Sequence, residues 1–146
     1  MRFAGYAAIF DVEDRGGDVV RRGAFAGASR EVPLLWQHRP GEPIGRIAMI
    51  AEDRRGLRVI GDLPDDAPAA EALRAGAVTG LSFGYRVKGA RGSRPRELTA
   101  LDLVEVSLVA MPMQPLARVH AVEGCKCEES SGSRYRTDIK RRRSCS

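Results

Sequence analysis

With 146 residues, 43% of them hydrophobic, the chain is long enough for one domain around one core and too short for two large domains. The formal net charge is +5, but residues 124–146 contain seven Lys or Arg against three Asp or Glu, so the rest of the chain is nearly neutral. This distribution excludes a basic groove for nucleic acid on the folded body and leaves only weak binding through the basic end.

Most of the chain has the pattern of a mainly β protein. Short stretches with period-two alternation of apolar and polar residues are separated by turn residues about every ten positions. The Gly16-Gly17 pair permits a tight turn with positive φ angles, and residues 53–56 have the length of a hairpin loop. Residues 23–29 are predicted to form a short helix. Strands are predicted around these features, at residues 3–10, 19–22, 32–38, 44–51 and 57–63.

The clearest helix signal lies at residues 69–75. The two acids at residues 65–66 supply a capping carboxylate, and Pro68 stands where proline is tolerated in the first turn. Gly76 follows as the residue that ends the helix.

The strand expected at residues 79–88 contains a candidate nucleophile, Ser82. Alternation places the large apolar side chains on one face and Ser82 on the other, between Gly80 and Gly84. Glycine here is tolerated where a ligand or another backbone approaches closely, as a peptide substrate would, but a bulge or a barrel corner explains it equally well. The letters Gly-x-Ser-x-Gly do not indicate an α/β-hydrolase, because strand character continues to Val87 instead of turning into a helix.

The strand expected at residues 98–111 contains a carboxylate, Glu105, among residues that are apolar on both faces. Alternation puts Glu105 on one face with Leu103 and Ser107. A carboxylate buried in such a strand needs a partner, for which an imidazole is a good candidate and an arginine in a structural ion pair is the alternative. The prolines from Pro112 onward end this strand, before a short terminal helix.

His38 closes the strand expected at residues 32–38, on the face of Trp36, and is followed by a turn at residues 39–41. A strand end beside a core suits a general base, which must be held by packing and still be reached by substrate, although a structural histidine is the alternative. His120 is the weaker candidate. The hydroxyl, imidazole and carboxylate are together sufficient for nucleophilic catalysis, because a neutral imidazole oriented by a carboxylate can accept the serine proton.

The C-terminal residues 124–146 are polar and small, and we expect a disordered basic tail. All three cysteines, Cys125, Cys127 and Cys145, lie in it without a neighbouring histidine, so we expect reduced thiols and no zinc site. No apolar run reaches the roughly 18 residues of a membrane helix, and the N-terminus lacks the features of a secretory signal. The chain is therefore expected to be soluble and intracellular.

Four blocks of sequence occur in an order that is specific as a set. They are Gly23-Ala24-Phe25, then Leu34-Leu35-Trp36-Gln37-His38 with Pro43-Ile44-Gly45, then Gly80-Leu81-Ser82-Phe83-Gly84, and finally Leu103-Val104-Glu105-Val106-Ser107-Leu108-Val109 with Pro112. In these blocks the chain resembles the prohead proteases of tailed phages, which are similar in structure to the herpesvirus assembly proteases. The resemblance covers residues 3–122.

The resemblance implies Ser82 as nucleophile, His38 as general base and Glu105 as the third member of a triad. Because the herpesvirus proteases use a histidine as third member, His120 is left as the alternative to Glu105. The implied fold is a closed or partly open β-barrel of about six to eight strands with a few flanking helices. No cofactor is implied. Met113-Gln114 stands where the family often has Ala-Asn, a departure that concerns a turn and not the mechanism.

The implied function is that of a serine endopeptidase of phage or phage-like capsid assembly, with residues 1–123 as the protease domain. It would work inside the immature capsid in the bacterial cytoplasm, with scaffold and major capsid protein as partners and substrates, and would often cleave itself. A homo-oligomer is left open, and no membrane partner is implied. The alternatives are a catalytically silent assembly or scaffold-binding module and a protein that binds nucleic acid through its tail.

Overall fold

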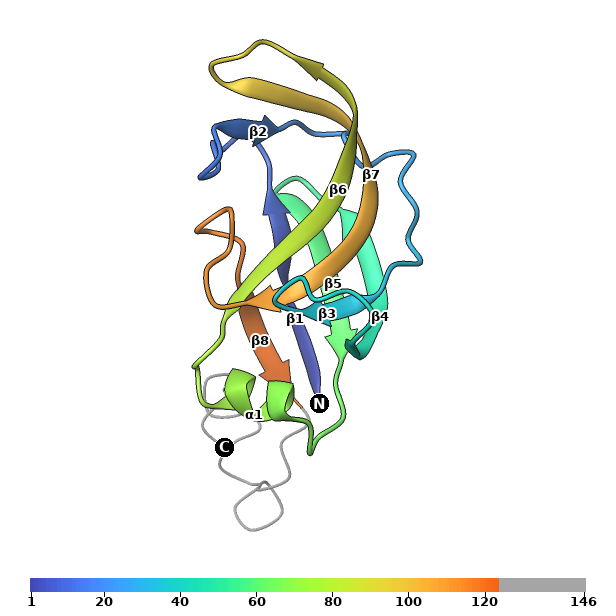
Figure 1. The fold of residues 1–146 in the computed structure, drawn as a ribbon, viewed down its shortest axis with the longest axis vertical. Coiled ribbons are helices and arrows are strands. Elements are labelled where there is room, and N and C mark those ends of the chain that lie inside the picture. Colours follow the sequence, from blue (N-terminus) through green and yellow to red (C-terminus); the bar gives the residue numbers. More distant parts are fainter. Residues whose placement is uncertain (124–146) are drawn as a thin grey trace.

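Strands dominate the part of the chain that the computed structural model describes, residues 1–123 (Figure 1). The elements in chain order are β1 (Arg2–Ile9), β2 (Asp18–Val20), β3 (Leu34–Trp36), β4 (Pro43–Glu52), β5 (Gly56–Asp62), α1 (Pro68–Arg74), β6 (Gly80–Arg91), β7 (Arg96–Val109) and β8 (Val119–Glu123). The predicted mainly β fold is confirmed. The expected tail and its three cysteines lie outside the described residues.

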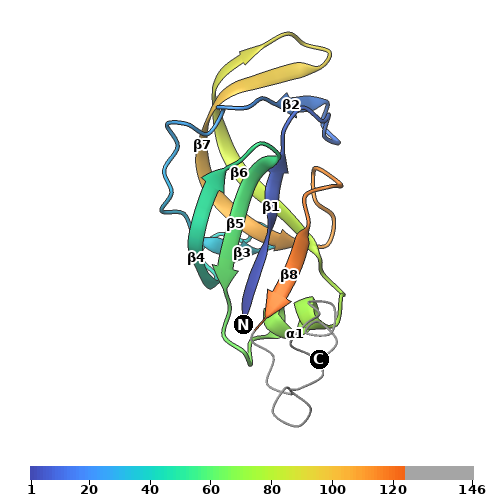
Figure 2. The same ribbon diagram turned by 180° about the vertical axis from the view of Figure 1, so that it is seen from behind.

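All eight strands belong to one strongly curved sheet, in which seven follow the order β2-β7-β3-β4-β5-β1-β8 and β6 pairs with β7 off this path. β2 and β3 pair in parallel with one edge of β7, and β6 pairs antiparallel with its other edge. The β6–β7 hairpin therefore lies on one side of the molecule, and β4, β5, β1 and β8 lie on the other (Figure 2). The sheet does not close into a continuous ladder.

Two backbone hydrogen bonds nonetheless connect the ends of this sheet. The Leu81 N–H donates to the Ala117 carbonyl, and the Val119 N–H donates to the Thr79 carbonyl, each at 2.9 Å. They join the start of β6 to the segment that leads into β8. The expected barrel is thus confirmed in its partly open form.

The interior of the barrel is filled by one cluster of buried apolar side chains from nearly every element. Leu34, Leu81 and Leu108 are fully buried, and the ring of Phe25 meets that of Phe83 edge to face at 5.3 Å. Burial of each such side chain contributes about 1.5–3 kcal/mol, so this cluster is the main source of stability. It also fixes the strands that carry the candidate site.

The helix predicted at residues 23–29 is wrong. The segment forms successive turns, in which the Ala24, Ala26 and Ala28 N–H groups each donate to the carbonyl three residues earlier. The Glu52 carboxylate accepts the N–H groups of residues 23 and 25, and Phe25 is fully buried. The core and a distant carboxylate, and not the local composition, therefore determine the conformation of this segment.

The helix predicted at residues 69–75 is confirmed by α1, which covers one end of the barrel beside β8 (Figure 1). Its N-cap, Ala67, makes no side-chain capping bond, so the predicted capping acid is wrong. Asp65 instead accepts a hydrogen bond from the N-terminal ammonium of Met1 at 2.6 Å. This is the one helix within residues 1–123, and it is not long and apolar enough to cross a membrane.

After β7, the chain forms a strand where a terminal helix was predicted. β8 pairs antiparallel with β1, with Phe3 opposite Val122. Pairing with an edge of the sheet satisfies its backbone groups, which outweighs the weak helix preference of a short segment. The predicted helices beyond α1 are therefore absent from the described residues.

Candidate active site

The β6–β7 ladder places Ser82 and Glu105 on one face. Ser82 lies opposite Ser107, and Gly84 lies opposite Glu105. Directly opposed residues of an antiparallel pair project to the same side, with Cβ atoms about 4.5–5.5 Å apart. The hydroxyl and the carboxylate thus stand two residues apart along the ladder.

A β-bulge in β7 determines which face Glu105 occupies. One residue of β7, Val104, has no opposite residue on β6, so the alternation shifts by one position there. Leu103 before the bulge and Val106 after it both face the core. The prediction that Glu105 shares a face with Leu103 is wrong for this reason, whereas Ser107 does lie on the face of Glu105.

His38 lies in a turn, not at the end of a strand as predicted. β3 ends at Trp36, and the next two residues have positive φ angles, 52° at Gln37 and 61° at His38. The Arg39 N–H donates to the Trp36 carbonyl at 3.0 Å, which closes a two-residue turn of this kind. Residues other than glycine seldom adopt this conformation, so the turn requires support from its surroundings.

Three hydrogen bonds attach this turn to the end of β7. The Gln37 N–H donates to the Leu108 carbonyl at 2.9 Å, and the Gln37 Oε1 accepts the Ala110 N–H at 3.2 Å. The His38 N–H donates to the Ser107 Oγ at 3.1 Å. The sheet brings His38 beside Glu105 although 67 residues separate them.

His38 and Glu105 are in direct contact. The His38 Nδ1 lies 2.5 Å from the Glu105 Oε2, and the Glu105 Oε1 accepts the Ser107 hydroxyl at 2.7 Å. The hydrogen bond to Glu105 raises the pKa of His38 because it favours the charged ring, while partial burial acts in the opposite direction. With Nδ1 occupied by the carboxylate, Nε2 is the nitrogen that can accept a proton.

Exposure differs strongly between the members of this cluster. The Glu105 side chain is 11% exposed, the His38 side chain 43%, and Ser82 6% as a whole residue. Between the described residues, the hydrogen bonds of the cluster join His38, Glu105 and Ser107, and none includes the Ser82 hydroxyl. A buried carboxylate therefore orients a reachable imidazole, and Ser82 lies one cross-strand step from Ser107.

The glycines beside Ser82 accommodate neighbouring protein atoms. A Cβ on Gly84 would collide with the Glu105 carboxylate, and a Cβ on Gly80 would come within 2.8 Å of the Val109 carbonyl and also press on Pro112. The sequence left open close approach by a substrate and a bulge or barrel corner. The register does shift at Gly84, opposite the bulge in β7, and protein atoms fill the space beside both glycines.

His120, the alternative third member, lies on β8. Its ring centroid is 5.8 Å from that of Tyr6, and its pKa is lowered by burial and by the charges of Arg58 and Arg55. The partner at the Nδ1 of His38 is the Glu105 carboxylate. Ser107, by contrast, was not predicted to take part, although its place two residues after Glu105 on the same face was visible in the sequence.

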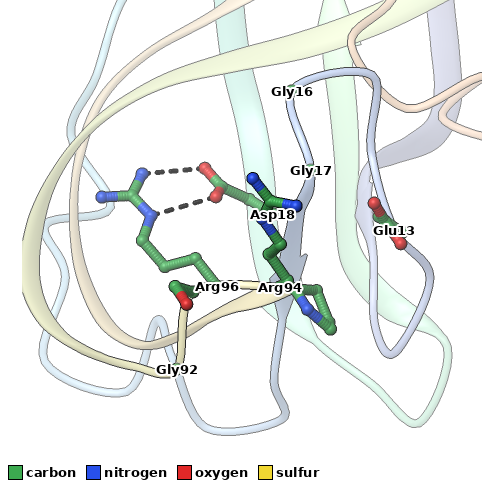
Figure 3. A pocket seen from close by; sticks show the side chains of 9 residues that line it. Glu13, Gly16, Gly17, Asp18, Gly92, Arg94 and Arg96 are labelled. Carbon is green, nitrogen blue, oxygen red and sulfur yellow. Dashed lines mark hydrogen bonds and ion pairs between the residues drawn. The ribbon is translucent and has the colours of Figure 1, made fainter.

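An open pocket lies between residues 13–18 and 92–96, at the far end of β7 from Glu105 (Figure 3). There the Arg96 guanidinium donates to both carboxylate oxygens of Asp18, at 3.0 and 2.8 Å. This ion pair lowers the pKa of Asp18 and joins β2 to β7. Ser82, His38 and Glu105 are not among the residues that line this pocket.

Comparisons with known proteins point to one family. A family model described as Caudovirus prohead serine protease matches residues 1–131. The prohead protease of Enterobacteria phage HK97 is 38% identical over 94 residues, which are 58% of this chain and 42% of that protein. The capsid polyprotein of Pseudomonas phage PAJU2 is 29% identical over 111 residues, 67% of this chain and 17% of that protein. The matched region is thus less than half the length of either relative.

Solved structures show the same fold. The protease of KSHV, in complex with a hexapeptide phosphonate inhibitor, superimposes with a TM-score of 0.59 at 14% identity. The varicella-zoster virus protease does so with a TM-score of 0.54 at 18% identity. Each match covers 97% of this chain and 72% of the other. The predicted likeness of fold to herpesvirus proteases is confirmed.

Proposed function

This chain belongs to the caudovirus prohead serine protease family, and from that membership we propose that it is a serine endopeptidase of phage or phage-like capsid assembly. We propose residues 1–123 as its protease domain, acting inside the immature capsid. Its substrates would be the scaffold or the scaffolding segment of the major capsid protein, and the protease itself. The names of the relatives, prohead protease and capsid polyprotein, support capsid proteins as substrates.

The observation that carries the proposed mechanism is the contact between His38 and Glu105 on the face to which Ser82 projects. The carboxylate fixes the ring with its proton on Nδ1, so Nε2 is the basic nitrogen. Glu105 also stabilises the imidazolium, as the raised pKa of His38 indicates. The alternative role for Glu105, an ion pair with an arginine, is disfavoured because its partners among the described residues are His38 and Ser107.

In the proposed reaction, the Ser82 Oγ attacks the carbonyl carbon of the scissile peptide while its proton passes to the His38 Nε2. The tetrahedral intermediate collapses when the same ring protonates the leaving amine, which leaves an acyl group on Ser82. A water molecule then attacks this ester and gives its proton to His38. Release of the carboxylate product restores the Ser82 hydroxyl and the neutral ring.

The test is co-expression of the chain with the major capsid protein of its particle, followed by mass spectrometry of all new termini. We expect cleavage by the wild type and a loss of at least about 1,000-fold for Ser82→Ala and for His38→Gln. Ser93→Ala, an exposed loop serine, is the matched control and should retain full activity.

Two outcomes would contradict the proposal. If Ser82→Ala still cleaved, Ser82 would have no part in the mechanism. If the folded wild type produced no new termini in any capsid protein or in itself, a silent assembly module would be favoured.

A further inference from the structure

Ser107 is a fully buried polar residue at the centre of the candidate site. Its exposed fraction is 0%, and it lies on β7 directly opposite Ser82. Its hydroxyl donates to the Glu105 Oε1 at 2.7 Å and accepts the His38 N–H at 3.1 Å. One hydroxyl therefore links the side chain of one proposed triad member to the backbone of another.

The donated bond fixes the orientation of the Glu105 carboxylate. A carboxylate held at one oxygen only can rotate about its last side-chain bonds, whereas two bonds define its plane. With Ser107 on Oε1, Oε2 is directed at the His38 Nδ1. Glu105 is also the charged group that acts on the pKa of the His38 ring. The alignment of this carboxylate thus affects the pKa of the His38 ring.

The accepted bond supports the strained turn. The N–H that donates this bond belongs to His38, whose φ of 61° is unfavourable for residues other than glycine. An alanine at position 107 would fill almost the same volume. It would remove the hydrogen-bond acceptor of this N–H and the donor to the Glu105 Oε1. Apolar packing of the strand therefore does not explain the serine, and the two hydrogen bonds do.

We propose that Ser107 is a positioning residue of this protease, which aligns Glu105 with the imidazole of His38 and holds the turn that carries it. The inference rests on the proposed function, because it assigns Ser107 an effect on the general base. Ser107 itself touches no reacting atom in the mechanism described above. Its effect on catalysis is exerted through Glu105 and His38.

The experiment compares Ser107→Ala, Ser107→Thr and the control Ser93→Ala. Steady-state kinetics on a peptide containing the mapped cleavage site gives kcat and KM. The pKa of the His38 ring is measured by NMR in proteins that also carry Ser82→Ala, so that this readout does not depend on cleavage. Thermal unfolding shows that each variant is folded at the assay temperature.

For Ser107→Ala we expect kcat to fall by about 10- to 100-fold with little change in KM, because the ring is misplaced while substrate binding is retained. The pKa of His38 should fall toward its ordinary value as the carboxylate loses its orientation. Ser107→Thr retains the hydroxyl and should restore both. If Ser107→Ala does not fold, Ser107→Cys, a close steric match with a weak donor, takes its place with the same expectations.

The inference is overturned if a folded variant without the hydroxyl keeps the wild-type kcat and the wild-type pKa of His38. An active wild type with this outcome leaves the proposed function intact. If instead the pKa of His38 falls in Ser107→Ala but the wild type cleaves nothing, the alignment stands and the proposed function fails.

Discussion

Glu105 is a carboxylate whose surroundings leave it little freedom. Its two oxygens are bound by His38 and Ser107, and its side chain covers the backbone of Gly84. A buried carboxylate is tolerated only when such partners replace water. The same contacts that offset the cost of burial also direct the acid at the imidazole.

Gly84→Ala tests this arrangement from the opposite strand. The new methyl group would collide with the Glu105 carboxylate, which cannot move aside without leaving His38. We expect a loss of about 1–3 kcal/mol in the free energy of unfolding, measured by urea denaturation, and a drop in kcat of about 10-fold or more.

Gly27→Ala is the matched control for this variant, since a Cβ there meets no atom within 4 Å. It should leave both quantities close to those of the wild type. Full activity of Gly84→Ala would mean that the position of the Glu105 carboxylate is not critical for catalysis.

At the scale of elements, the loop between β7 and β8 is held by Gln114. The Gln114 Oε1 accepts the Ile9 N–H at 2.6 Å, and its Nε2 donates to the Ile9 carbonyl at 3.1 Å. The side chain thus occupies both backbone groups at the end of β1 and is itself buried, with 3% exposed. Gln114 is thus a structural anchor of this turn.

Gln114→Ala should lower the free energy of unfolding by about 1–3 kcal/mol, because it leaves a buried N–H and a buried carbonyl without partners. Urea denaturation followed by the fluorescence of Trp36 measures the change. Leu116→Ala, in the same loop but 62% exposed, should be nearly neutral. Equal stability of the two variants would show that water replaces the amide of Gln114.

Elements with a strong local pattern were predictable from the sequence. The hairpin of β4 and β5 forms as expected, because Asp53 accepts the N–H groups of Arg55 and Gly56 within the loop itself. The turn at His38 and the bulge at Val104 were not predictable, because contacts with β7 and β6 create them. The three proposed triad residues were chosen from the sequence for their chemistry, whereas the role of Ser107 depends on geometry that alternation alone does not give.

At the scale of the whole molecule, two ionisable groups, His38 in a turn and Asp18 on β2, contribute to stability with opposite dependence on pH. The hydrogen bond to Glu105 raises the pKa of His38, so this contribution to stability is complete below the ordinary histidine value of about 6.5 and is lost as the pH rises through the raised value. The ion pair with Arg96 lowers the pKa of Asp18. That contribution is present above the ordinary aspartate value of about 4 and is lost as the pH falls through the lowered value.

We therefore expect the melting temperature of the Ser82→Ala protein to fall toward both ends of the range from about pH 3 to pH 9. Adding His38→Gln should remove part of the fall on the alkaline side, and adding Asp18→Asn part of the fall on the acid side. Differential scanning calorimetry at constant ionic strength measures both. A His38→Gln profile parallel to that of the parent from pH 6 to pH 9 would contradict the raised pKa.

The bulge at Val104 means that the chemistry of β7 depends on a count of residues as well as on their identity. If every residue of β7 were paired regularly and Leu103 still faced the core, the side chain of Glu105 would face the apolar interior and that of Val106 would face outward. Deletion of Val104 itself would remove the bulge without turning the acid inward, because Leu103 and Glu105 would then be neighbours on a regular strand and would face opposite sides. Transfer of this motif to another scaffold therefore requires the register of the strand after the bulge as well as the serine, the histidine and the acid.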